Sequence, residues 1–181
     1  TSSGKTGGAA VGQTANDYWN FYTRDNGVGG YRSSGSLSDL KLADGTVTPA
    51  GMTVLNAPGA WNIGSTDPMY DSYVYPLNGG NVTLTFTNLP TGAYDLYIYC
   101  FDGNYQVTAG DTDYGTQTNR DYPVVNPPGW QEGQQYALFR GVQVGSGEAD
   151  RGILVGGTGL GICITANKSR ASSARSGNAV Y

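Results

Sequence analysis

Short runs of strand-forming residues, separated by glycine and proline, limit what this chain can fold into. The 29 Gly and 8 Pro residues interrupt regular elements all along its 181 residues. Between them, Val, Ile, Thr, Tyr and Phe recur in short runs, and apolar residues show no helical period of any length. We therefore expect an all-β chain with many turns.

The clearest strand prediction covers residues 81–101. Within 81–88, three apolar residues alternate with threonines, so one face of this strand is apolar and the other is polar. Residues 89–92 read Leu-Pro-Thr-Gly, in which Pro90 fixes φ and the glycine is free to adopt a positive φ, as a turn requires. A second strand is predicted over 94–101, and we expect the two strands to pair as a hairpin.

Further runs of the same composition bring the expected number of short strands to about ten. They cover residues 17–22, 37–42, 52–56, 105–109, 114–118, 135–144, 152–155 and 161–165. Residues 67–71, Asp-Pro-Met-Tyr-Asp, fit either the first turn of a helix or a plain loop. Many short strands between turns predict an antiparallel β-sandwich or a barrel.

The two ends differ in composition from the rest of the chain. Residues 166–181 are rich in Ser and Ala and carry basic residues without any acidic one, so we expect a flexible linker or an added tail. Residues 1–8 are expected to be flexible as well. A chain of this length buries enough surface for one core, so residues 9–165 are predicted to form a single β-sandwich domain.

The composition excludes several classes of function. The chain has no His, so it forms neither a Ser-His-Asp triad nor an imidazole metal site. Its net charge of -4 provides no positive field for nucleic acid, and no apolar run reaches the ~20 residues of a membrane span. We expect neither a nucleic-acid nor a membrane partner.

Two cysteines, Cys100 and Cys163, each lie within a predicted strand. They fit one disulfide of an exported protein, and they fit two small buried side chains equally well, because strand register decides between these alternatives. Neither has a basic neighbour in the sequence, so a reactive thiolate is not expected.

The stretch Gly79–Tyr99 resembles the central hairpin of galactose-binding-like and malectin-like modules, which are jelly rolls of secreted bacterial proteins that act on polysaccharides. In those modules a polar strand ends in Leu-Pro-x-Gly-x-Tyr, as residues 89–94 do here, and leads into an apolar strand. Residues 136–144 are similar to the strand before the closing pair, whereas 161–165 depart from the closing strand. The resemblance implies a jelly-roll β-sandwich, a secreted or extracellular location and a catalytic domain in the same parent chain.

Aromatic and hydrogen-bonding side chains on the outward face of the predicted hairpin and on loops rich in Gly and Pro are the candidate binding residues. Aromatic rings stack on the C–H faces of sugars, while amide and carboxylate groups bond to sugar hydroxyls. The alternative is that the tyrosines simply favour strands and complete the sandwich. The candidates are Trp130, Trp61, Tyr97, Tyr99, Asp95 and Gln131.

These features predict a non-catalytic carbohydrate-binding module that recognises a neutral polysaccharide of the β-glucan or hemicellulose type. One alternative is a small glycoside hydrolase with two carboxylates, Glu132 and Glu148, or a lyase. Another is a structural or adhesive β-sandwich that binds a protein partner.

Acidic loops suggest a metal site. Asp102, Asp111 and Asp113 lie in Asp-Gly and Asp-x-Asp patterns whose oxygens fit structural calcium, and the same patterns occur in ordinary turns. The predicted function itself requires no cofactor.

Overall fold

The computed structural model describes residues 16–62, 64–66, 72–77, 79–99, 102–120 and 129–146, together with the backbone of 5–6, 153–158, 163–168 and 179–180. The regular elements of these residues are all strands, so the all-β prediction is confirmed. No described segment is a helix, and hence none offers a helix able to cross a membrane. The helical turn considered at 67–71 lies outside the described residues.

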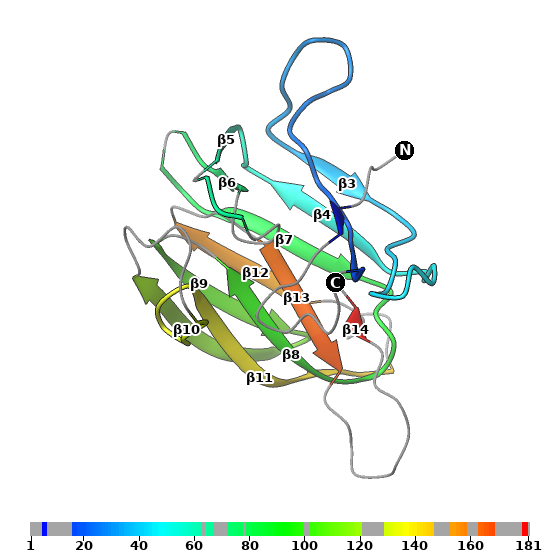
Figure 1. Ribbon diagram of the computed structural model, residues 1–181. Helices are drawn as coiled ribbons and strands as arrows, with labels where there is room; N and C mark the ends of the chain where they lie inside the picture. Colours follow the sequence, from blue (N-terminus) through cyan, green and yellow to red (C-terminus); the bar gives the residue numbers. More distant parts are fainter. Residues whose placement is uncertain are drawn as a thin grey trace.

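The described strands, in chain order, form four antiparallel sheets (Figure 1). The strands are β1 Lys5–Thr6, β2 Tyr18–Trp19, β3 Gly35–Leu37, β4 Gly51–Leu55, β5 Gly59–Asn62, β6 Ser72–Tyr75, β7 Val82–Thr87, β8 Gly92–Tyr99, β9 Asp102–Ala109, β10 Thr112–Arg120, β11 Tyr136–Val144, β12 Ile153–Thr158, β13 Cys163–Lys168 and β14 Ala179–Val180. The six-stranded sheet has the order β10-β9-β12-β7-β4-β3, and the four-stranded sheet has the order β11-β8-β13-β14. The pairs β1-β2 and β5-β6 form two small sheets.

The hairpin predicted over 81–101 is wrong, although both of its strands exist. β7 pairs with β4 and β12 in the six-stranded sheet, whereas β8 pairs with β11 and β13 in the four-stranded sheet. The connection between them passes from one sheet to the other. Leu89 is buried at this crossing, and the Tyr94 hydroxyl donates to the Pro90 carbonyl oxygen at 2.5 Å. The Leu-Pro-Thr-Gly sequence thus marks a change of direction without joining paired strands.

Apolar side chains from both larger sheets form one buried cluster. β7 contributes its three alternating apolar residues, as predicted, and β8 contributes Tyr94, Leu96 and Ile98. Val107 of β9 and Val142 of β11 also belong to the cluster. Burying apolar surface contributes about 25 cal/mol per Å² to the free energy of folding, so this shared cluster is the main source of stability.

Most other predicted strands match an observed strand with different bounds. The runs 105–109 and 114–118 are parts of the longer β9 and β10, and 135–144 corresponds to β11. By contrast, 17–22 contains only the short β2, 37–42 shares only Leu37 with β3, and no strand was predicted at β1, β5, β6 or β14. β5 begins at Gly59, which is a poor strand residue, yet a side chain at this position would clash with the Tyr75 ring that covers it.

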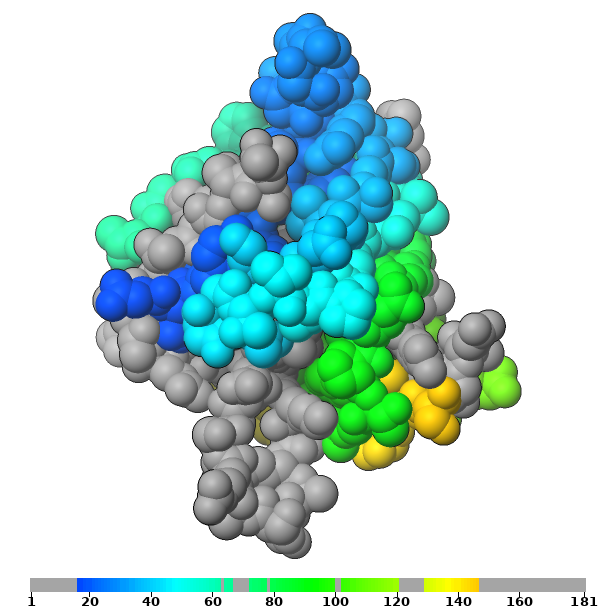
Figure 2. Space-filling model, turned by 90° about the vertical axis from the view of Figure 1, so that its right-hand side faces the viewer, coloured from blue at the N-terminus to red at the C-terminus, as the bar shows by residue number. Residues whose placement is uncertain are grey.

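The loop between β2 and β3 projects from one end of the molecule, at the top of Figures 1 and 2. Its base is tied to the body, because Arg24 Nη1 donates to the Pro58 carbonyl oxygen at 2.5 Å. The Arg24 guanidinium also lies 4.0 Å from the centre of the Tyr31 ring. Val28 at the tip remains 85% exposed. None of the predicted binding residues lies in this loop.

The substitution Leu96→Ala tests whether the shared cluster stabilises the fold. Leu96 has no exposed surface, so the cavity should lower the free energy of unfolding by about 2–5 kcal/mol. Leu77→Ala is the matched control, because Leu77 is 57% exposed and its truncation should change stability by no more than about 0.5 kcal/mol. Urea unfolding followed by circular dichroism measures both. Equal effects of the two substitutions would contradict a core at this position.

Candidate functional site

The outer face of the four-stranded sheet carries the candidate site. Along β8, Tyr94, Leu96 and Ile98 point into the core, so Asp95, Tyr97 and Tyr99 point away from it. Strand β11 lies beside β8 and is paired so that its outward residues extend the same face. Two neighbouring strands therefore present one continuous surface of aromatic and charged groups.

Four aromatic side chains, Tyr97, Tyr99, Trp130 and Tyr136, form what we call the aromatic cluster. The Tyr136 ring lies 5.3 Å from that of Tyr97 and 6.0 Å from that of Tyr99, centre to centre. The ring of Trp130 meets that of Tyr99 edge to face, at 5.4 Å and 88°. Tyr99 is buried, while Tyr97, Trp130 and Tyr136 are only half-buried. The exposed parts of these three rings are therefore open to a ligand.

The turn before β11 positions Trp130 over the sheet. Gln135 is buried and its side-chain oxygen accepts a hydrogen bond from the Gln131 amide at 3.0 Å. Gly133 donates to the Tyr136 carbonyl oxygen at 2.8 Å, with a positive φ of 80° that favours glycine. These local bonds fix the turn that begins directly after Trp130.

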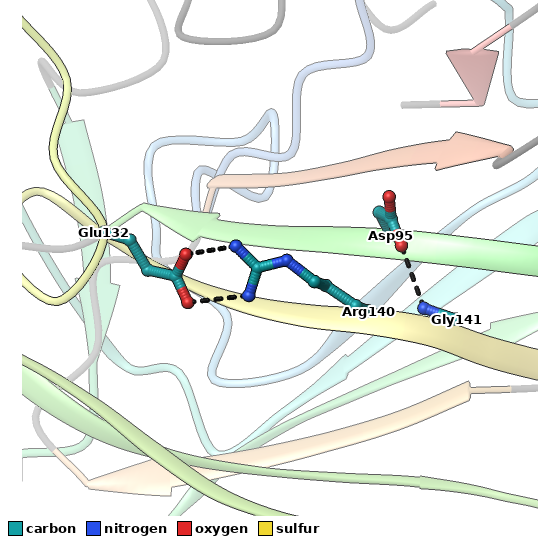
Figure 3. A network of polar contacts seen from close by, with 4 residues as sticks. All are labelled: Asp95, Glu132, Arg140 and Gly141. Carbon is teal, nitrogen blue, oxygen red and sulfur yellow. Dashed lines mark hydrogen bonds and ion pairs between the residues drawn. The ribbon is translucent and has the colours of Figure 1, made fainter.

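An ion pair between Arg140 and Glu132 borders the aromatic cluster, close enough for its charges to act on Tyr97 and Tyr136. Figure 3 shows the pair. Arg140 donates through Nη1 to Oε1 of Glu132 at 2.9 Å and through Nη2 to Oε2, so the pair is bidentate. Both side chains are partly exposed, at 61% for Arg140 and 38% for Glu132. The hydrogen bonds from Arg140 lower the pKa of Glu132, and those same bonds raise the pKa of Arg140. Glu132 is thus held as a carboxylate with little tendency to accept a proton.

Burial raises the pKa of two tyrosines in the cluster. For Tyr97 the second cause is the negative charge of Asp95, and for Tyr136 it is the negative charge of Glu132. Both phenols therefore keep their protons at neutral pH and act as hydrogen-bond donors. The site offers two phenolic donors, one carboxylate acceptor and three half-buried rings.

The structure brings together most of the binding residues predicted from the sequence. Tyr97, Tyr99 and Trp130 lie in the aromatic cluster, Asp95 lies on the same face, and Gln131 belongs to the turn beside Trp130. Trp61 does not join them: it lies on β5, opposite Tyr73 in the separate β5-β6 pair, and is 64% exposed. That these residues bind a ligand stays a prediction.

Sequence reasoning missed Tyr136 and Arg140. Part of the signal was present, because Tyr136 and Arg140 alternate with the buried residues Ala137 and Phe139, although Leu138, between them on the same face, is buried as well. Their place beside Tyr97 and Tyr99 depends on the pairing of β8 with β11, which no local pattern in the sequence reveals.

The predicted pair of catalytic carboxylates is not assembled in the described residues. Glu132 is bound to Arg140, and Glu148 lies outside the described residues. The disulfide considered between Cys100 and Cys163 also stays a prediction, because Cys100 lies outside them as well.

The three aspartates predicted to bind calcium do not converge. Asp102 begins β9 opposite Arg120, whereas Asp111 and Asp113 lie at the other end of the β9-β10 hairpin. Asp113 accepts hydrogen bonds from the Gln106 side chain at 3.0 Å and the Gly115 amide at 2.8 Å, as in an ordinary turn. Across the part of the chain that the structure describes, no three or more His, Cys, Asp or Glu side chains are grouped to hold a metal ion.

Comparison with known proteins gives one family match. The family is described as Ribose/Galactose Isomerase, and it matches residues 111–177, a stretch that contains β10 to β13. The match covers fewer than half of the 181 residues, so it is a likeness over one stretch and does not establish membership. No curated protein and no solved structure matches the chain.

This match contradicts two predictions from the sequence. The resemblance of residues 79–99 to galactose-binding-like and malectin-like jelly-roll modules is wrong, because the matching family has a different fold. The non-catalytic carbohydrate-binding role is contradicted by the same match, because the matching family is one of sugar isomerases. The pattern at 79–99 indicates a strand, a turn and a second strand. Folds with different functions share such local features. The secreted location, the polysaccharide partner and the structural calcium stay predictions.

The substitution Arg140→Met tests the ionisation of Glu132. It removes both donors to the carboxylate, so the pKa of Glu132 should rise toward the ordinary glutamate range. Because folding lowers this pKa, the ion pair contributes stability above the unfolded glutamate pKa, and this contribution is lost as the pH falls through the lowered value. Carbon-13 NMR titration of the side-chain carboxyl groups measures the shift.

Arg24→Met is the matched control for that substitution. Arg24 donates to the Pro58 carbonyl oxygen and stacks on Tyr31, so its removal should leave the pKa of Glu132 where it is in the unmodified protein. A low Glu132 pKa that persists in Arg140→Met would show that the bidentate pair is not its cause.

Proposed function

We propose that the aromatic cluster binds a monosaccharide of the ribose or galactose type. The observation that carries this proposal is the packing of three tyrosines and a tryptophan beside a carboxylate on one sheet face. Ring faces and edges contact the C–H groups of a sugar, while the Glu132 carboxylate and the tyrosine hydroxyls bond to its hydroxyl groups. The family match supports the proposal, because the matched stretch contains Trp130, Glu132, Tyr136 and Arg140.

The charges of the site favour an uncharged ligand. Glu132 and Arg140 neutralise each other in a bidentate pair, and Tyr97 and Tyr136 keep their protons at neutral pH. A ligand of this kind makes hydrogen bonds and ring contacts rather than ion pairs, so its affinity should depend little on salt concentration.

Binding of D-ribose and D-galactose by the unmodified protein and two tryptophan variants tests the proposal. Trp130→Ala should weaken binding by about tenfold, the change that corresponds to 1.4 kcal/mol of lost ring contact. Trp61→Ala is the matched control and should leave the affinity unchanged, because Trp61 lies outside the cluster. Amide shifts in nitrogen-15 NMR spectra during sugar titration give both affinities and the location of the site.

The substitution Tyr97→Phe, in the same sugar titration, tests the contribution of one tyrosine hydroxyl to binding. It keeps the ring and removes the hydroxyl, so binding should weaken by roughly two- to tenfold, as expected for one lost hydrogen bond. No shift with either sugar at millimolar concentration, or equal losses in Trp130→Ala and Trp61→Ala, would contradict the proposal.

A second candidate function is aldose–ketose isomerisation, which the family match favours directly. In this reaction a base moves the proton of C2 to C1, and a hydroxyl proton passes from O2 to O1, so the sugar is neither oxidised nor reduced overall. The described acids of the matched stretch are Asp111, Asp113 and Glu132, and only Glu132 borders the aromatic cluster. Its lowered pKa makes it a weak base, so the geometry supports sugar binding more directly than proton transfer.

Incubation of D-ribose or D-galactose with the protein in heavy water tests isomerisation. A sugar isomerase should produce ketose that carries deuterium at C1, and Glu132→Gln should abolish the exchange. Proton NMR detects both the ketose and the loss of the exchanging signal. Binding without exchange would leave the binding proposal intact and exclude isomerisation of these two sugars.

We also propose that the two larger sheets form one antiparallel sandwich. The support is the buried cluster, to which strands of both sheets contribute side chains. In such an arrangement the outer face of the four-stranded sheet, on which the aromatic cluster lies, is directed away from the core.

A further inference from the structure

A β-bulge in β11 lies at the edge of the aromatic cluster. Phe139 is opposite Leu96 and Val142 is opposite Tyr94, so two residues of β11, Arg140 and Gly141, face the single residue Asp95 of β8. Gly141 has a φ of 64°, a value that favours glycine. Bulges of this kind locally bend a strand and redirect its side chains.

The bulge keeps the valines after Arg140 buried. Val142 and Val144 are both buried, and Arg140 is exposed. If β11 alternated regularly after Phe139, Arg140 would still point outward, but Gly141 would point into the core and Val142 would point outward. The bulge shifts the alternation by one residue after Arg140, so that Val142 and Val144 stay in the core.

Asp95 holds the bulge through one hydrogen bond. Its Oδ1 accepts the Gly141 amide proton at 2.8 Å, and Figure 3 shows the carboxylate directed at this amide. The guanidinium of Arg140 extends the other way along β11, toward Glu132 (Figure 3). Asp95 is therefore bound to the backbone, and Arg140 remains available for Glu132.

We propose that Asp95 is a positioning residue: by binding the Gly141 amide it holds the bulge that directs Arg140 to Glu132, and so it sets the polar side of the sugar site. The effect on the ligand rests on the proposed function, whereas the effect on the Arg140–Glu132 pair does not.

Three charged or titratable side chains lie close to Glu132. Arg140 binds it directly, and Tyr136 and Tyr97 are close enough for its charge to raise their pKa values. Asp95 acts on Arg140 and Tyr97 through its charge as well as through its hydrogen bond. A test must therefore separate the charge of Asp95 from its hydrogen bond.

The matched pair Asp95→Asn and Asp95→Ala makes this separation. The asparagine keeps an oxygen that accepts the Gly141 proton and loses the charge, whereas the alanine loses both. In Asp95→Ala, the pKa of Glu132 should rise toward its ordinary value, and sugar affinity should fall by about fivefold, as for one lost hydrogen bond. In Asp95→Asn, the pKa of Glu132 should stay close to that of the unmodified protein, because the oxygen that accepts the Gly141 proton is kept.

Carboxyl carbon-13 titration, sugar titration and thermal unfolding are measured on each variant. A Glu132 pKa that is unchanged in Asp95→Ala, or that changes equally in both variants, would overturn the positioning role. If the unmodified protein binds no sugar, the comparison of the Glu132 pKa in the two variants still tests the positioning role of Asp95. The failure of this proposal is therefore distinguishable from that of the proposed function.

Hydrogen exchange at the Gly141 amide tests the same proposal without requiring that Asp95→Ala folds. The Gly141 amide should exchange slowly in the unmodified protein and in Asp95→Asn, because its proton is bound in both. Exchange at the rate of an exposed amide in the unmodified protein would show that Asp95 does not hold the bulge.

Discussion

Strand β8 carries the constraint on which both the core and the candidate site depend. Because successive side chains of a strand point to opposite faces, burial of Tyr94, Leu96 and Ile98 directs the residues between them outward. A shift of one residue would place a carboxylate in the core and two large apolar side chains on the surface. The hydrophobic effect that stabilises the fold therefore also presents Asp95 and Tyr97 on the outer face.

Strand β11 contributes side chains to both faces of the sheet, and with its sequence after Arg140 it keeps its valines in the core only through a bulge. It must supply buried apolar side chains to the core and a charged side chain to the outer face at a fixed place beside β8. The bulge lies at Arg140 and Gly141, and the bond from the Gly141 amide to Asp95 ties it to β8. The result is an ion pair beside the aromatic cluster.

Most of the longer strands were predictable from the sequence, and their partners were not. The alternation in 82–87 predicted correctly which side chains are buried, because period-two alternation needs only local information. The turn at 89–92 suggested a hairpin, yet β7 and β8 belong to different sheets, since pairing is decided by core contacts distant in the sequence. Tyr136 and Arg140 were missed for this reason: only the β8–β11 register shows that they lie beside Tyr97.

The contacts between a bound sugar and individual rings test the central claim most directly. Intermolecular nuclear Overhauser effects from D-ribose or D-galactose C–H protons should appear at the ring protons of Tyr97, Trp130 and Tyr136, the half-buried members of the aromatic cluster. Such effects at Trp61, with none in the cluster, would place binding on the β5-β6 pair and contradict a sugar site on the outer face of the four-stranded sheet.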